Sequence, residues 1–131
     1  MNFLTTLTTN NTDTVTLSVT EIINDTLCIT CEAGQQVFEA IAAAFRENKS
    51  VVLSFKDCED FTRGFLSEGI AQLYEYFPEE QIRNSLSIVD IDPEDAEYIE
   101  NVIYWRRRYL ENPERFKEAA KESLCAEDND E

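Results

Sequence analysis

The spacing of apolar residues along the chain switches between the two-residue period of strands and the longer period of helices. In the first twenty residues, apolar side chains alternate with threonines, and a run of turn-forming residues over 10–13 divides them into two groups. This pattern predicts a β-hairpin. The apolar positions of its two arms are Phe3, Leu4 and Leu7, followed by Val15, Leu17 and Val19. A connector over 21–26 and a short further strand over 27–30 are expected next.

The period lengthens at Glu32, where the pattern becomes that of an amphipathic helix ending near Asn48. The apolar residues of this helix recur three and four positions apart and form one face. They are Val37, Ala40, Ile41, Ala44 and Phe45. The apolar, β-branched run over 50–55 follows, and it predicts a buried central strand.

An acidic loop over 56–60 leads into a second predicted helix, which starts at about Thr62 and ends before Pro78. Its apolar positions are again three and four residues apart. They are Phe65, Leu66, Gly69, Ile70, Leu73 and Phe77. A short helical turn is expected over 79–84, and a further strand over 86–91.

The segment Asp92-Pro93-Glu94-Asp95 carries the signals of a helix start. It offers a capping aspartate, proline at the first helical position, and acids at the positive end of the helix dipole. This third helix is predicted to end before Pro113. A last helix over 114–124 has Phe116, Ala119 and Ala120 on its apolar side. No linker divides the chain, so we predict a single domain over 1–125 and a disordered acidic tail over 126–131.

The charge of the chain narrows its expected partners. Its 131 residues include 27 acidic and 11 basic side chains, which gives a net charge of −16. Such a charge repels nucleic acid and anionic lipid and favours basic protein partners. No apolar run approaches the ~20 residues that cross a bilayer, and the N-terminus lacks the features of a secretory signal. We therefore expect a cytoplasmic protein that binds neither nucleic acid nor membrane directly.

The residues available for chemistry are few. The chain has no histidine, which removes histidine-based metal sites and the usual base for serine or cysteine nucleophiles. Cys28 and Cys31 have the spacing of a redox motif, but on a strand their sulfurs would point to opposite faces. We predict buried, reduced, unreactive thiols. No phosphate-binding glycine loop or EF-hand spacing occurs, and we predict no catalytic residue, no cofactor and no metal site.

One part of the chain resembles a known family. The strand Val51-Val52-Leu53-Ser54-Phe55 and the following segment Phe61–Tyr74 resemble the signature of the STAS-like family of unknown function, which is related to sulfate-transporter and anti-sigma-factor-antagonist domains. Glu32–Val37 resembles the family's helix opening. The resemblance covers roughly residues 17–115. It implies an α/β fold, with a small mixed sheet of about four to five strands and helices packed against it, and a role in protein interaction without catalysis.

The resemblance also directs attention to the start of the second helix. In the anti-sigma-factor antagonists a serine at this place is phosphorylated by an ATP-dependent partner kinase, which switches binding off. Here Thr62 is the residue that can accept a phosphate, and Ala71 replaces a glycine usual in the family. A phosphate at Thr62 would be favoured by Arg63 and the helix N-terminus but opposed by the acids just upstream. The alternative is that Thr62 is a plain N-cap. Both interpretations stay open.

We therefore expect a non-enzymatic regulatory or interaction module. Its partner-binding surface is predicted at the acidic loop and the start of the second helix: Asp57, Glu59, Asp60, Thr62, Arg63, Ser67 and Glu68. The expected partner is a protein, either a kinase-like ATPase or a basic protein, and the oligomeric state is left open. The alternative function is a small acidic inhibitor or nucleic-acid mimic that occupies a basic protein groove. The basic cluster Trp105–Tyr109 is expected to pair with acids of the same chain.

Overall fold

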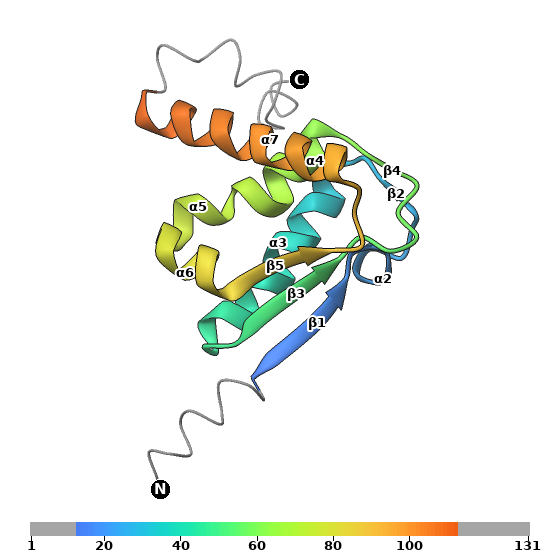
Figure 1. Ribbon diagram of the computed structural model, residues 1–131, viewed down its shortest axis with the longest axis horizontal. Helices are drawn as coiled ribbons and strands as arrows, with labels where there is room; N and C mark the ends of the chain where they lie inside the picture. Colours follow the sequence, from blue (N-terminus) through green and yellow to red (C-terminus); the bar gives the residue numbers. More distant parts are fainter. Residues whose placement is uncertain (1–12, 113–131) are drawn as a thin grey trace, which may run out of the picture.

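A computed structural model describes residues 13–112 of the chain. Three strands form a parallel sheet in the order β1-β3-β5. They are β1 (Thr14–Ser18), β3 (Ser50–Ser54) and β5 (Leu86–Val89). The register pairs Leu17 with Leu53, and Leu53 with Ile88. Figure 1 shows β3 between the other two, as expected for the most apolar strand.

A second, smaller sheet contributes two short strands. β2 (Leu27–Cys28) pairs in parallel with β4 (Asp60–Phe61). The five strands thus lie in two small sheets, and every pairing within 13–112 is parallel, whereas one mixed sheet was predicted. The reason is that helices connect the strands, which carries the chain back to the same end each time. The N-terminal arm of the predicted hairpin, the helix predicted over 114–124 and the acidic tail lie outside the described residues.

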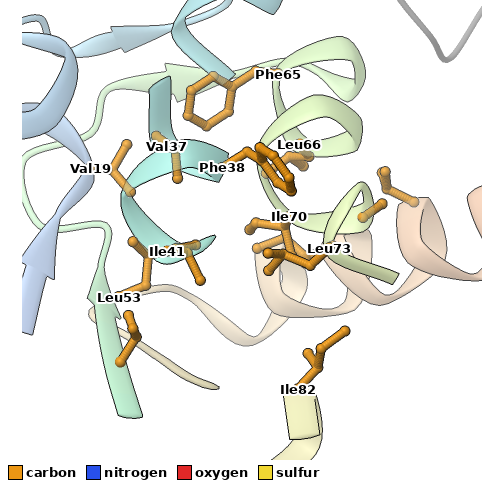
Figure 2. Packing of buried hydrophobic residues seen from close by; sticks show 14 of the residues in the cluster. Val19, Val37, Phe38, Ile41, Leu53, Phe65, Leu66, Ile70, Leu73 and Ile82 are labelled. Carbon is orange, nitrogen blue, oxygen red and sulfur yellow. The ribbon is translucent and has the colours of Figure 1, made fainter. Parts of the chain in front are cut away.

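The first predicted helix is confirmed as α3 (Cys31–Arg46). Thr30 is its N-cap, because the Thr30 side-chain oxygen accepts a hydrogen bond from the Ala33 N–H at 3.0 Å. Its buried face includes the predicted apolar positions Val37, Ile41 and Phe45. In Figure 2 side chains of α3 lie between Val19 and Leu53 on one side and Leu66 and Ile70 on the other. This helix is therefore the centre of the core.

The second predicted helix is not continuous. It consists of α4 (Arg63–Leu66), the π-helical segment η1 (Ser67–Ala71) and α5 (Leu73–Tyr76). In η1 the Gln72 N–H donates to the carbonyl oxygen of Ser67, five residues earlier, at 2.9 Å. A π segment inserts one extra residue per turn and rotates the side chains that follow it. The predicted continuous helix is therefore wrong across this segment, although the predicted apolar positions Phe65, Leu66, Gly69, Ile70 and Leu73 are buried.

Two glycines bring α3 and η1 into close contact. Gly34 of α3 and Gly69 of η1 are both buried. A Cβ atom at Gly34 would lie 2.6 Å from the carbonyl oxygen of Phe65, and one at Gly69 would lie 3.1 Å from the carbonyl oxygen of Gly34. The absence of side chains at this crossing lets the two backbones approach each other, as packing between small residues requires.

The remaining helices complete the described part of the chain. α6 (Glu79–Ser85) precedes β5, and α7 (Pro93–Glu111) follows it, as predicted. Asp92 occupies the N-cap position of α7, but its side chain accepts no capping hydrogen bond. The short helix α2 (Val19–Ile23) replaces the end of the predicted hairpin and the start of the predicted connector. Among residues 13–112, no helix has the length and apolar character needed to cross a membrane.

Candidate functional site

The carboxyl ends of β1, β3 and β5 meet at one edge of the sheet, because the three strands are parallel. The acidic loop leaves β3 at this edge. The hydroxyl of Thr20, just after β1, donates to the carbonyl oxygen of Lys56 in the loop at 3.4 Å. The hydroxyl of Ser54, at the end of β3, donates to Asp90, just after β5, at 2.5 Å. Ligands of open parallel sheets bind at this edge, so it is the first place to look for a functional surface.

Three residues at this edge have left-handed backbone conformations. Asn24 has a φ of 58°, Asp57 a φ of 69° and Asp90 a φ of 60°. Asn and Asp adopt this conformation more readily than other residues with a Cβ atom. It turns the chain sharply after α2, β3 and β5, and it places the acidic loop beside the turn that follows α2.

The acidic loop and the turn after α2 together form a shallow depression that opens to solvent. Its lining consists of Thr20, Glu21, Asn24, Asp25, Thr26, Asp57, Cys58 and Glu59. The two sides are held together by Glu59 and Thr26, since the Glu59 N–H donates to the Thr26 carbonyl oxygen at 2.9 Å and the Thr26 hydroxyl donates to the Glu59 carboxylate at 2.9 Å. Four carboxylates and no basic side chain line this depression, so it favours a cationic group.

The start of the second helix is built on Thr62, which is the N-cap of α4. Its hydroxyl oxygen accepts from the Phe65 N–H at 3.2 Å and its hydroxyl donates to the carbonyl oxygen of Ile29 at 3.0 Å. Arg63 turns toward α7, where its guanidinium donates to Asn101 at 3.1 Å and lies 5.5 Å from the centre of the Tyr98 ring. Both side chains therefore have structural contacts in the fold.

Ser67 does not lie on this surface, contrary to the prediction. It has no exposed area, because η1 turns it inward, where its hydroxyl accepts from Arg106 at 2.8 Å. Glu68 is half-buried beside it, and burial raises the pKa of the Glu68 carboxyl above its ordinary value. Of the predicted site residues, Asp57 and Glu59 are exposed in the loop and Asp60 is exposed at the start of β4. Thr62 and Arg63 follow, and Ser67 and Glu68 lie farther along the helical segment.

Arg106 and Arg107 of the basic cluster pair with acids of the same chain, as predicted, but these acids belong to α5 and α6 and not to the neighbouring part of α7. Arg106 is buried and forms an ion pair with Glu75, and it also donates to the carbonyl oxygen of Ser67 at 3.1 Å. Arg107 pairs with Glu79 at 2.8 Å. The hydrogen bond from Arg107 holds the pKa of the Glu79 carboxyl below its ordinary value. These pairs join α7 to η1, α5 and α6, so Arg106 and Arg107 hold α7 against the rest of the fold.

The cysteines behave differently from one another. Cys28 and Cys58 are free, and their Sγ atoms lie 3.2 Å apart. Cys28 is fully buried and Cys58 half-buried, and burial raises the pKa of both thiols. Cys31 takes part in a disulfide, so the prediction of a reduced thiol is wrong at this position. Sequence reasoning considered Cys28 with Cys31 and missed Cys58, which is 30 positions away from Cys28 and close to it in space.

The fold and this edge define a small parallel α/β domain whose acidic carboxyl edge faces solvent. Residues 33–96 match the family described as a STAS-like domain of unknown function (DUF4325). The resemblance predicted from the sequence is therefore confirmed over this segment. The match includes the acidic loop and the start of α4, but it begins after α2 and β2. No curated protein and no solved structure matches the chain.

Proposed function

We propose that the chain is a non-enzymatic interaction or regulatory module that binds a protein partner at the carboxyl edge of its sheet. The contact surface includes the acidic loop and the start of α4. The observation that carries this proposal is the depression lined by Glu21, Asp25, Asp57 and Glu59, which is open to solvent and contains no basic side chain. Its chemistry suits a partner with an exposed basic surface, where opposite charges speed association and select against acidic competitors.

The hydrogen bonds at this edge support a binding role over a catalytic one. Ser54 is bonded to Asp90, and the Thr62 hydroxyl is engaged at both its proton and its oxygen. A hydroxyl nucleophile needs an adjacent base to activate it, and the chain has no histidine for that purpose. For Thr62 we propose the N-cap role. A phosphate there would replace the bond to Ile29 and add charge beside Asp60.

The test compares two variants that change the net charge equally. The double variant Asp57→Asn/Glu59→Gln removes two charges from the depression, while Glu97→Gln/Glu111→Gln removes two from exposed positions of α7. Each protein is immobilised and used to capture partners from a lysate of its native host. A protein that wild type and the α7 variant retain, and the loop variant loses, supports the proposal. Equal loss from both variants would mean that only overall charge matters and would contradict it.

A competition arm separates a protein-binding module from a nucleic-acid mimic. A captured partner is challenged with duplex DNA at fixed salt. A mimic occupies the groove in which the partner holds nucleic acid, so DNA would displace the mimic from the partner. A partner of the interaction module would stay bound.

A further inference from the structure

Two free cysteines from distant parts of the sequence face each other at the end of the acidic depression. Cys28 belongs to β2 and has no exposed surface, while Cys58 belongs to the acidic loop and is half-buried. Their Sγ atoms lie 3.2 Å apart. We propose that Cys28 and Cys58 are an oxidisable pair that closes into an intramolecular disulfide and covalently links β2 to the acidic loop.

The geometry around the pair requires little movement. A disulfide bond is about 2.05 Å long, so the two sulfurs need to approach by only about 1 Å. The backbones on either side of the pair are already hydrogen-bonded to each other. The Glu59 N–H donates to the carbonyl oxygen of Thr26 at 2.9 Å, and the Thr62 N–H donates to that of Cys28 at 3.2 Å. These bonds hold the two segments that carry the cysteines side by side.

The difference in burial assigns the order of the reaction. Cys58 has exposed surface, so its thiolate attacks a low-molecular-weight disulfide such as oxidised glutathione, forms a mixed disulfide and releases one glutathione thiolate. The thiolate of buried Cys28 then attacks the Cys58 sulfur and releases the second glutathione. Two electrons pass from the two cysteines to the oxidant, and the two protons end on the two glutathione thiols.

The burial of the two cysteines and the carboxylates around them make this reaction slow near neutral pH. Burial raises the pKa of both thiols, and the nearby carboxylates add to it: Asp25 and Asp60 at Cys28, and Asp60 and Asp95 at Cys58. The attacking species is the thiolate, so the rate is expected to rise as the pH increases above neutral. A pair with these properties stays reduced under mild conditions and closes only under sustained oxidation.

The disulfide is a bond within the chain, so its formation does not depend on the proposed function. Its consequence would nevertheless reach the acidic depression, since Cys58 lies between Asp57 and Glu59 in the sequence. The disulfide would close a loop of about thirty residues, which restricts the unfolded chain and stabilises the fold.

The experiment uses the full chain, incubated with oxidised glutathione at mildly alkaline pH, then alkylated, digested with trypsin and analysed by mass spectrometry. The first trypsin site is Arg46, so Cys28 and Cys31 share one peptide, while Cys58 lies on the peptide 57–63. We expect these two peptides to become joined, with the loss of two hydrogens, in addition to the disulfide that Cys31 already forms, and to separate again with dithiothreitol. The oxidised protein should unfold at a temperature higher by at least several degrees.

Three variants identify the bond. The joined peptide should persist in Cys31→Ser and disappear in Cys58→Ser. In Cys28→Ala the reaction should stop at a mixed disulfide with glutathione on Cys58. Alanine suits a fully buried position, and thermal unfolding of each reduced variant checks that it is folded. A joined peptide that persists in Cys28→Ala, or wild-type protein that accumulates only the mixed disulfide or keeps both thiols available for alkylation, would overturn the proposal.

Discussion

The contact between α3 and η1 allows a quantitative test through Gly34→Ala. A Cβ atom at this position would lie 2.6 Å from the carbonyl oxygen of Phe65 and 3.0 Å from the Cβ of Glu68. Carbon and oxygen atoms that are not bonded pack at about 3.5 Å, so the two backbones would have to separate by about 0.9 Å. Neither atom belongs to the end of a flexible side chain, so the strain cannot be relieved locally.

The size of the effect follows from two opposing contributions. Forcing an extra methyl group into a close-packed interior costs about 1–3 kcal/mol, and a clash with backbone belongs at the upper end of that range. Alanine in a helix is favoured over glycine by about 1 kcal/mol, which offsets part of the cost. We therefore expect Gly34→Ala to lower the free energy of unfolding by about 2 kcal/mol. For a domain of this size the melting temperature would fall by about 10 °C.

Urea unfolding followed by far-ultraviolet circular dichroism measures this change, provided that the dependence on urea concentration is unaltered. Two further variants isolate the cause. Ala43→Gly, at an exposed position of α3, measures the helix-propensity contribution in the same helix. Gly69→Ala brings its Cβ no closer than 3.1 Å to the carbonyl oxygen of Gly34, so its cost should be smaller. If Gly34→Ala were as stable as wild type, the close approach of the two segments would be refuted.

Three more predictions concern buried and capping groups. Arg106→Met leaves the Ser67 hydroxyl and the partly exposed Glu75 without their partner. The free energy of unfolding in urea should fall by about 2–4 kcal/mol, and adding Ser67→Ala should recover part of that loss. If the second substitution recovered nothing, the contact between Arg106 and Ser67 would be contradicted. The pKa of Glu68 is raised by burial, so the folded state holds its proton more tightly than the unfolded state, and stability contributed by that proton is lost as the pH rises above the ordinary range of the carboxyl. Glu68→Gln should therefore have a higher free energy of unfolding than wild type at pH ~7 and a similar one at pH ~3. Equal free energies of unfolding for the two proteins at both pH values would refute this prediction. Thr62→Val should cost about 1 kcal/mol and Thr62→Ser little, because serine also caps; equal losses in thermal unfolding would argue against the cap.

Much of the fold could be predicted from the sequence because its signals are local. The apolar period of α3 and the β-branched run of β3 each specify an element directly, and the observed bounds lie close to the predicted ones. The helix α2 had a signal that was not used. Ser18 and Glu21 have the spacing of a capping box, and the Ser18 side chain does accept from the Glu21 N–H, at 3.3 Å.

Other features depend on contacts that no local pattern contains. The π segment η1 moves Ser67 into the core, where Arg106 satisfies its hydroxyl, so a serine expected at the surface became buried. Cys28 and Cys58 meet because β2 and β4 pair, and both strands are only two residues long. A strand of two residues has no detectable period, which is why neither the ladder nor the cysteine pair could be predicted.

The two proposals are connected by the charge at the carboxyl edge. Burial is the largest cause of the raised pKa of both thiols, and nearby carboxylates raise it further. One of these carboxylates, Asp25, acts on Cys28 and also lines the depression. A basic partner bound there would oppose that charge and so lower the pKa of the thiols. It would also cover the exposed part of Cys58 and hinder a glutathione-sized oxidant. Salt screens the carboxylates without covering the cysteine, so high ionic strength should speed the oxidation of the free protein. If a bound partner nevertheless slows the oxidation, access to Cys58 limits the reaction in the complex. A bound partner would then protect the acidic loop from oxidation.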